Sequence, residues 1–172
     1  MPVKIIFLDR DGVINIDKNY LYQINDFEFI DGIFQACSHF QNLGFSIIII
    51  TNQSGISRGF YSEKEFLKLT KWMLLQFKKN NIDILDIFHC PHAQDSNCNC
   101  RKPMPGMFLE AQKKYNIDMK RSWMIGDRER DISAAEISGV TNTILINKIP
   151  IVDSKAKFIT DSLLKVIKII KH

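Results

Sequence analysis

Two carboxylates that stand two residues apart, Asp9 and Asp11, have the spacing that most directly suggests chemistry in this sequence. They follow the apolar run Ile5–Leu8 and precede Gly12, so a buried strand would bring both acids to the edge of a sheet. Open α/β sheets bind ligands at the edge where their strands end. Two acids this close repel each other unless they share a cation, and Mg²⁺ held by carboxylates and a substrate phosphate would supply it. The alternative is a polar turn after a strand.

Two further segments carry groups suited to phosphate. Thr51–Ser54 follows an apolar run and offers a hydroxyl and two amides, which can donate hydrogen bonds to phosphate oxygens. Arg101 and Lys102 are adjacent cations that Pro103 and Pro105 stiffen, so their positive charge would be directed with little entropy left to lose. A plain polar turn and a surface charge pair are the respective alternatives.

A fourth segment places another carboxylate at a strand end. Asp127 follows the apolar residues Met124 and Ile125, where it could complete a metal site with Asp9 and Asp11. Asp131 comes four residues later, and its expected structural role is to cap the helix that follows.

Three of the four cysteines lie within eleven residues and, with one histidine, form the pattern Cys-x-His followed by Cys-x-Cys. The four residues are Cys90, His92, Cys98 and Cys100. In a cytoplasmic chain this spacing indicates zinc rather than disulfides, and four ligands would close a structural tetrahedron that pins the loop before Arg101. A redox role for the thiols and Asp95 as a substitute ligand are the alternatives.

Composition indicates a soluble globular protein with one domain over residues 1–172, since 45% of residues are hydrophobic and 24% are charged. The net charge of +4 forms no stripe of lysine and arginine with interleaved aromatics, which argues against nucleic acid as a partner. The longest apolar stretch, Phe45–Ile50, is strand length, and the first residues contain no signal-peptide pattern. We therefore expect a cytoplasmic protein without a membrane partner.

Apolar runs and amphipathic segments alternate, which is typical of a mainly parallel sheet between two layers of helices. We expect a three-layer α/β/α Rossmann-like fold without a large cap domain. Strands are expected at Lys4–Leu8, Ser46–Thr51, Ile84–His89, Trp123–Gly126, Thr143–Ile146 and Phe158–Ile159. Helices are expected at Ile33–Leu43, Ser62–Lys79, Met107–Tyr115, Ile132–Ser138 and Ser162–Lys171, the second with a capping box from Ser62 to Glu65.

The four polar segments, in this order at four strand ends, resemble the haloacid dehalogenase superfamily of phosphotransferases over nearly the whole chain. Within it, the segments Leu8–Asn15, Phe27–Gly32, Thr51–Gly59 and Cys100–Met107 are similar to the histidinol-phosphatase-like branch, which also carries the zinc site. The resemblance implies a Mg²⁺-dependent phosphomonoesterase with the haloacid dehalogenase fold. The implied reaction removes the 7-phosphate of D-glycero-D-manno-heptose 1,7-bisphosphate in ADP- or GDP-heptose biosynthesis. In the family, the heptose products serve lipopolysaccharide biosynthesis or surface glycoconjugates.

The resemblance also implies roles for individual residues. Asp9 would be the nucleophile that forms an aspartyl-phosphate, and Asp11 the acid and then the base. Thr51 and Lys102 would stabilise the transferring phosphoryl group, while Asp9, Asp127 and the main-chain carbonyl of Asp11 would hold Mg²⁺. The implied substrate contacts are Asp17, Lys18, Asn19, Tyr20, Thr51, Asn52, Gln53, Ser54, Arg101, Lys102 and Arg128.

Histidinol phosphate is the alternative substrate, and the segment Ser54–Gly59 favours the heptose bisphosphate. A DNA 3′-phosphatase would use the same core, and a catalytically silent, zinc-stabilised binding module is the alternative outside enzymes. Without a cap the site should be open to a bulky phosphorylated sugar, and a monomer is expected.

Overall fold

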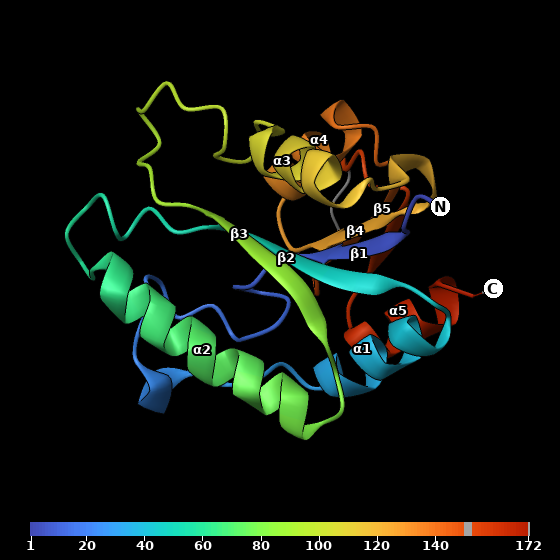
Figure 1. The fold of residues 1–172 in the computed structure, drawn as a ribbon, viewed down its shortest axis with the longest axis horizontal. Helices are drawn as coiled ribbons and strands as arrows, with labels where there is room; N and C mark the ends of the chain where they lie inside the picture. Colours follow the sequence, from blue (N-terminus) through green and yellow to red (C-terminus); the bar gives the residue numbers. More distant parts are fainter. Residues whose placement is uncertain (150–152, 172) are drawn as a thin grey trace.

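The structure is a computed structural model that describes residues 1–149 and 153–171. Six parallel strands form one sheet in the order β3-β2-β1-β4-β5-β6 (Figure 1). The strands are β1 (Ile5–Leu8), β2 (Ser46–Asn52), β3 (Ile84–Cys90), β4 (Trp123–Gly126), β5 (Asn142–Ile146) and β6 (Phe158–Thr160). Every predicted strand is present, and no strand end differs from its prediction by more than one residue.

Helices cover both faces of the sheet, which confirms the predicted three-layer α/β/α fold. The helices are α1 (Ile33–Asn42), α2 (Glu63–Lys79), α3 (Gly106–Tyr115), α4 (Glu129–Ile137) and α5 (Leu163–Ile169). Figure 1 shows α3 and α4 on one face and α1, α2 and α5 on the other. Two short 3-10 helices, Ile24–Asp26 and Met119–Arg121, were not predicted.

The central strand β1 divides the hydrophobic core into two layers. Ile6 and Leu8 pack among the side chains of α1, α2 and α5, whereas Ile5 and Phe7 pack among those of α3 and α4. All four side chains are fully buried. Because successive residues of a strand point to opposite faces, an uninterrupted apolar run is what a strand covered on both sides requires.

The predicted start of α4 is wrong by three residues. The helix begins at Glu129 rather than Ile132, so Asp131 is its third residue and not its N-cap residue. The Asp131 carboxylate accepts hydrogen bonds from the backbone N–H of Arg128 and Asp127, at 3.1 and 3.2 Å. An acid within the first turn of the helix therefore caps its start. The prediction missed the first turn because it placed the capping acid before the helix.

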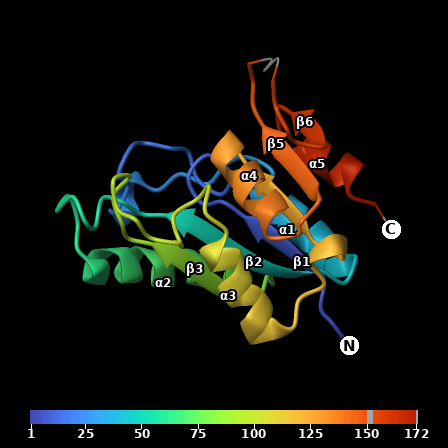
Figure 2. The ribbon, with the colours of Figure 1, turned by 90° about the horizontal axis from the view of Figure 1, so that it is seen from above.

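The order of the strands creates a binding position between β1 and β4. From β1 the chain moves outward to β2 and β3, and it then returns to the other side of β1 to form β4, β5 and β6. Loops that leave β1 and β4 therefore diverge at their carboxyl ends, which is where open parallel sheets bind ligands. Seen from above, the loops after β1, β2 and β3 gather at one end of the sheet (Figure 2).

The described part of the chain has no helix long and apolar enough to cross a membrane. The described segments between the strands hold loops, helices and isolated bridges, so they contain no cap sheet, in agreement with the prediction.

Helix α2 begins with the predicted capping box. The Ser62 hydroxyl accepts a hydrogen bond from the Glu65 backbone N–H at 3.2 Å, and the Glu65 carboxylate accepts one from the Ser62 N–H at 2.7 Å. We predict that Ser62→Ala lowers the free energy of unfolding by about 1 kcal/mol, because one backbone donor loses its acceptor. Urea denaturation measures this loss. The same change at exposed Ser38, within α1, should alter stability by less than about 0.5 kcal/mol, and equal effects at both sites would contradict the assignment.

Candidate active site

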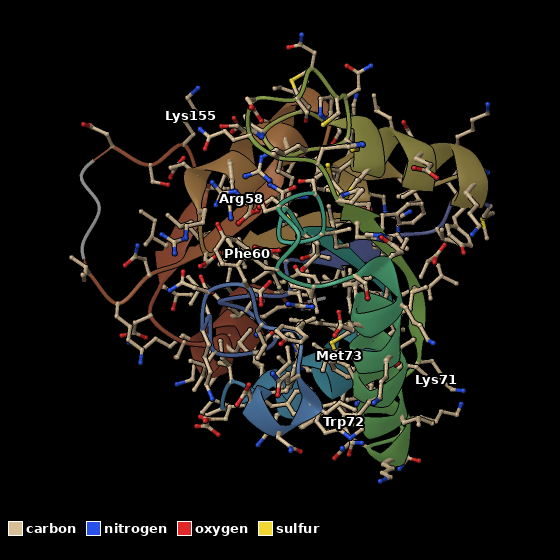
Figure 3. The ribbon with its side chains drawn as sticks, turned by 90° about the vertical axis from the view of Figure 1, so that its left-hand side faces the viewer. Arg58, Phe60, Lys71, Trp72, Met73 and Lys155 are labelled. Atoms are coloured by element: carbon tan, nitrogen blue, oxygen red, sulfur yellow. The ribbon has the colours of Figure 1, made fainter. Side chains whose placement is uncertain are left out.

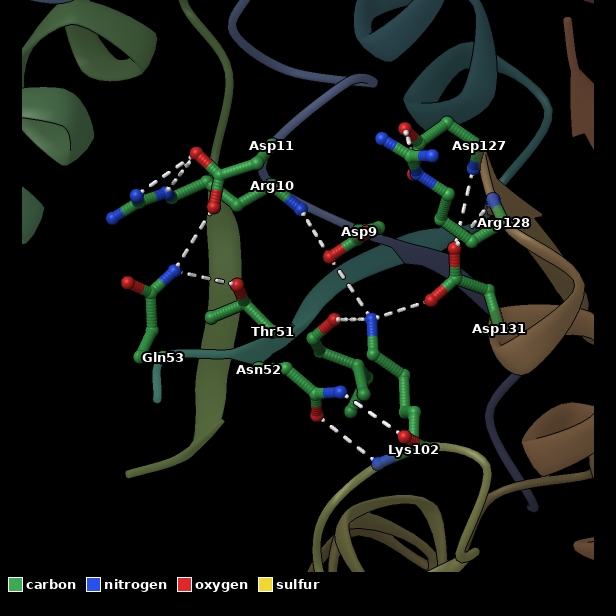
Figure 4. Close-up of polar contacts among 11 residues, drawn as sticks. Asp9, Arg10, Asp11, Thr51, Asn52, Gln53, Lys102, Asp127, Arg128 and Asp131 are labelled. Carbon is green, nitrogen blue, oxygen red and sulfur yellow. Dashed lines mark hydrogen bonds and ion pairs between the residues drawn. The ribbon is translucent and has the colours of Figure 1, made fainter. Parts of the chain in front are cut away.

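A buried ion pair network lies where β1 and β4 end. The Lys102 ammonium lies 2.9 Å from Asp9 Oδ1 and 2.8 Å from Asp131 Oδ1 (Figure 4). It also donates a hydrogen bond to the main-chain carbonyl of Ile50, at 2.7 Å. The side chains of Lys102 and Asp131 have no exposed surface, so this lysine is held in one position by two acids.

Carboxylates outnumber cations at this position. Burial and the nearby Asp131 raise the pKa of Asp9 to about 8, against the opposing effect of Lys102. Burial and Asp131 likewise raise the pKa of Asp127 to about 6. Burial alone would lower the pKa of Lys102, but Asp131 and Asp9 outweigh it and raise that pKa. The site therefore carries unbalanced negative charge, and a bound divalent cation would reduce the repulsion among its carboxylates.

The geometry fits such a cation. Carboxylate oxygens of Asp9, Asp127 and Asp131 all lie within 4.8 Å of one another. Asp127 Oδ1 is buried and has no hydrogen-bond partner among the described residues. A Cβ at Gly12 would come within 2.2 Å of Asp127 Oδ2, so the glycine leaves room for this carboxylate. An all-oxygen set is what Mg²⁺ prefers.

The carboxylate of Asp11 lies apart from this group and is tightly oriented. Its Oδ1 accepts hydrogen bonds from Arg10 Nη2 and Asn15 Nδ2, both at 2.9 Å. Its Oδ2 accepts one from Gln53 Nε2 at 3.1 Å. The structure thus brings together the carboxylates of Asp9 and Asp127, which were both predicted to bind metal. The Asp11 carboxylate points elsewhere, and its predicted contact to metal was through its main-chain carbonyl.

The loop that carries Lys102 is fastened to β2 by an amide pair. Asn52 Nδ2 donates to the Lys102 carbonyl at 3.1 Å, and Asn52 Oδ1 accepts from the Lys102 N–H at 3.0 Å. Thr51 is buried beside them, and its hydroxyl accepts a hydrogen bond from Gln53 Nε2 at 2.9 Å. Thr51 and Lys102 therefore form the floor of the site.

A cavity of about 480 Å³ lies next to these residues, since Asp11 and Asn52 are part of its lining. Of the predicted substrate contacts, Asp17, Asn19, Tyr20, Asn52, Gln53, Ser54, Arg101 and Arg128 line it. Thr51 and Lys102, which are buried, do not line the cavity. Lys18 does not line it either and instead forms an ion pair with Glu28 at 2.6 Å. The structure adds Asp11, Tyr61, Gln94 and Arg130 to the lining.

Several functional residues were missed by sequence reasoning. Arg10 stands between the two motif acids and could have been recognised as a partner for one of them. The sequence shows Arg130 only as a second arginine, two residues after Arg128, and does not indicate that it lines the cavity. The role of Asp131 as a partner of Lys102 depends on a contact between residues that are 29 positions apart, which spacing alone does not reveal.

The predicted zinc ligands also lie together. Ligand atoms of Cys90, His92, Cys98 and Cys100 fall within 4.8 Å of one another. His92 Nδ1 lies 3.4 Å from Cys90 Sγ and 3.2 Å from Cys100 Sγ. Burial raises the pKa of the Cys98 thiol, but hydrogen bonds from Ser96 and from the Arg101 backbone outweigh burial and lower it to about 6. A Cys₃His set with an accessible thiolate is compatible with zinc.

Comparisons with known proteins agree with this geometry. Residues 99–148 match the family model described as HAD-hydrolase-like. The D-glycero-alpha-D-manno-heptose-1,7-bisphosphate 7-phosphatase of Campylobacter jejuni is 49% identical over 148 residues, covering 86% of this chain and 85% of the relative. The enzyme of the same name from Photorhabdus laumondii is 48% identical, covering 84% and 82%.

Relatives named for the beta anomer match as well. The D-glycero-beta-D-manno-heptose-1,7-bisphosphate 7-phosphatase of Pasteurella multocida is 40% identical, covering 98% of this chain and 97% of the relative. The crystal structure of D,D-heptose 1,7-bisphosphate phosphatase from B. bronchiseptica, complexed with magnesium and phosphate, superposes with a TM-score of 0.85. It is 27% identical and covers 96% of this chain and 97% of that one. The chain therefore belongs to the family of heptose-1,7-bisphosphate 7-phosphatases among the haloacid dehalogenase-like hydrolases.

Proposed function

We propose that this chain removes the 7-phosphate from D-glycero-D-manno-heptose 1,7-bisphosphate in a Mg²⁺-dependent reaction. The observation that carries the proposal is the Asp9–Lys102–Asp131 network next to a cavity lined by Asp11, Arg101, Arg128 and Arg130. The network offers a nucleophile and a fixed cation to one phosphate, and the arginines offer a second anion site. A substrate with two phosphates uses both.

Asp9 is oriented for attack on phosphorus. Its Oδ1 lies near Lys102 Nζ and accepts a hydrogen bond from the Arg10 backbone N–H at 2.8 Å. The two contacts occupy Oδ1 and leave Oδ2 to attack. In the first step Oδ2 forms a bond to phosphorus, the bond from phosphorus to sugar oxygen 7 breaks, and Asp11 gives its proton to that oxygen.

In the second step the acyl phosphate is hydrolysed. Asp11 takes a proton from a water molecule, the water oxygen attacks phosphorus, and the bond from phosphorus to Asp9 Oδ2 breaks. Inorganic phosphate leaves and both carboxyl groups return to their starting states. Lys102 and Thr51 stabilise the negative charge on the phosphoryl oxygens. Mg²⁺ held by Asp9, Asp127 and the carbonyl of Asp11 would neutralise the charge that accumulates between nucleophile and phosphate.

The three arginines give the phosphate on carbon 1 its binding site. Arg101 reaches the cavity from the loop after the zinc ligands, and Arg128 and Arg130 reach it from the start of α4. Arg128 also lies 3.5 Å from Asp17 and 3.3 Å from Asp127, so it links the distal site to the acids. Guanidinium groups bind phosphate through paired hydrogen bonds, which fixes the orientation of the sugar.

The comparisons favour the α anomer of this bisphosphate. Two relatives from Photorhabdus laumondii match the chain, and the one named for the alpha anomer is 48% identical whereas the one named for the beta anomer is 43% identical. We therefore propose the α anomer as the preferred substrate. The anomer decides whether the product serves ADP-heptose or GDP-heptose biosynthesis.

We further propose that residues 1–172 act as a single catalytic domain in the cytoplasm, as a monomer. One sheet contains strands from β1 near the start of the chain to β6 near its end, which supports one domain. A small phosphorylated sugar fits the cavity, and the proposal involves neither nucleic acid nor a membrane as a partner.

A substrate series with Mg²⁺ tests the activity. We expect rapid phosphate release from the α bisphosphate, slower release from the β bisphosphate and little from histidinol phosphate, because only the bisphosphates occupy the arginine site. Asp9→Asn should reduce the rate about a thousand-fold or more, since it removes the nucleophile. Preference for histidinol phosphate would contradict the proposal.

A second test concerns the unbalanced negative charge of the carboxylates in the site. Because the pKa of Asp127 is raised to about 6, its ionised form destabilises the fold at pH 8 but not below about pH 3, where the group is protonated in both the folded and unfolded states. We predict that Asp127→Asn raises the free energy of unfolding by about 2 kcal/mol at pH 8 without metal, and leaves it unchanged at about pH 3. Denaturation at both pH values measures the difference.

Mg²⁺ at pH 8 should raise the melting temperature of the wild type and have little effect on Asp127→Asn. Asp26→Asn, at an exposed position, serves as the matched control and should respond to Mg²⁺ as the wild type does. A metal-free Asp127→Asn variant less stable than the wild type at pH 8 would contradict the charge argument.

A third test concerns zinc. We predict one zinc ion per wild-type chain by elemental analysis, and its loss in Cys98→Ala. The variant should melt at a lower temperature and have a raised KM, because the ligand cluster pins the loop that carries Arg101. Cys37→Ala changes a cysteine buried within α1 and should keep the zinc. A wild-type chain purified without zinc and with disulfides would favour the redox alternative.

A further inference from the structure

Two loops meet through aromatic side chains at the rim of the cavity. Tyr20, from the segment after β1, contacts Phe60, from the segment after β2, with ring centroids 4.5 Å apart and planes inclined at 54°. Tyr22 and Tyr61, from the same two segments, are stacked at 5.5 Å and 13°. Alternate residues of the first loop therefore face the second, and their contact closes one side of the cavity.

Arg58 joins this contact from the second loop. Its guanidinium donates a hydrogen bond to the Tyr20 hydroxyl. It also lies 5.7 Å from the centroid of the Tyr20 ring and 5.9 Å from that of the Phe60 ring. Figure 3 shows Arg58 and Phe60 on the loop between β2 and α2. We call Tyr20, Tyr22, Arg58, Phe60 and Tyr61 the rim cluster.

The loop that carries Arg58 is firmly fixed. The Arg58 N–H donates to the Ser54 carbonyl at 3.1 Å, and the Ser57 N–H donates to the Pro91 carbonyl at 3.2 Å. Pro91 directly follows Cys90, one of the proposed zinc ligands. Arg58 therefore projects from a turn that is anchored to the sheet edge on one side and to the zinc loop on the other.

The segment that carries Tyr20 depends more on outside contacts. Asn19 and Tyr20 have φ angles of 53° and 57°, in the left-handed region. A bulky residue such as tyrosine adopts this conformation only where surrounding contacts impose it. The Asn19 N–H donates to Asp17 Oδ1 at 3.0 Å. Among the described residues, the Tyr20 side chain has a hydrogen bond with Arg58 and a ring contact with Phe60. The ends of the segment have anchors of their own, because the Leu21 carbonyl accepts a hydrogen bond from Arg10 Nη2 at 3.0 Å and Asp17 lies 3.5 Å from Arg128.

We propose that Arg58 is a positioning residue for substrate binding, a role that rests on the proposed function. Tyr20 and Asn19 line the cavity, whereas Arg58 does not, so Arg58 acts through Tyr20. By holding the Tyr20 ring against Phe60, it keeps the segment from Asp17 to Tyr20 in place as a wall that contacts the sugar. This wall provides in a small fold the substrate contacts that a cap domain would otherwise supply.

A positioning role predicts a specific kinetic pattern. Among the described residues, no hydrogen bond or ion pair joins Arg58 to Asp9, Asp11 or Lys102, so chemistry should proceed normally once substrate is bound. Arg58→Ala should raise KM for the heptose bisphosphate about two- to five-fold, the loss expected for an exposed charged contact, and change kcat less than about two-fold. A small aryl phosphate without the sugar should show an unchanged KM.

Three companion variants sharpen the kinetic test. Arg58→Lys keeps a donor for the Tyr20 hydroxyl but lacks the planar guanidinium, so it should restore part of the KM. Tyr20→Phe removes the hydroxyl and keeps the ring, and its effect should not add to that of Arg58→Ala in the double variant. Arg121→Ala removes an exposed arginine just before the start of β4, at the opposite end of the sheet, and should match the wild type.

Amide hydrogen exchange provides a readout that needs no turnover. In Arg58→Ala the amides of residues 16–22 should exchange faster than in the wild type, while those of α2 should be unchanged. Faster exchange together with a higher KM supports the proposal. Unchanged exchange overturns it, and so does faster exchange with an unchanged KM, which would make Arg58 purely structural. An equal loss of kcat on both substrates also overturns it.

The proposed function fails in a different way from this inference. A wild-type enzyme that releases phosphate from the aryl phosphate but not from the heptose bisphosphate would overturn the substrate assignment. Exchange in residues 16–22 would then still decide whether Arg58 positions the wall.

Discussion

The ammonium of Lys102, buried between the carboxylates of Asp9 and Asp131, is the interaction on which the rest of the site depends. A lysine without exposed surface loses its hydration, and only charges at hydrogen-bond distance can compensate for that loss. Two acids do so here, and the carbonyl of Ile50 adds a third acceptor. With Asp127 close by, the cluster carries more acid than base, so the same arrangement that fixes the lysine also leaves a set of carboxylate oxygens that would suit Mg²⁺.

The fold supplies each member of this cluster from a different position along the chain. Asp9 follows β1 and Asp127 follows β4. These neighbouring parallel strands lead into separate loops, because the order in which the chain adds strands reverses between them. Lys102 comes from the loop before α3, which has no strand to hold it. The amide of Asn52 joins that loop to β2 through two hydrogen bonds, and the proposed zinc cluster restrains its other end.

Sequence patterns predicted the helices and strands well where neighbouring residues alone decide the structure. An apolar run gave the range of β4, and the capping box at Ser62 marked the start of α2. Contacts between residues distant in sequence were not predictable. Arg58 and Tyr20 are 38 positions apart, and the pattern of either segment says nothing about the other.

The misplaced start of α4 has the same physical origin as the missed role of Asp131. Sequence reasoning treated this acid as a local cap, because capping is the interaction that neighbouring residues suffice to make. In the structure the two carboxylate oxygens of Asp131 contact different partners. Oδ2 accepts hydrogen bonds from the N–H groups of Asp127 and Arg128, and Oδ1 faces Lys102.

One side chain thus sets the relative position of three functional groups. By accepting a hydrogen bond from the backbone N–H of Asp127, Asp131 fixes the point from which the carboxylate of Asp127, a proposed Mg²⁺ ligand, projects, and by pairing with Lys102 it fixes the ammonium beside Asp9. A Cβ at Gly126 would lie 2.4 Å from the Cβ of Asp131, so this close approach requires glycine at the end of β4. Helix capping and the assembly of the site are therefore a single interaction, and a change at Asp131 would alter both together.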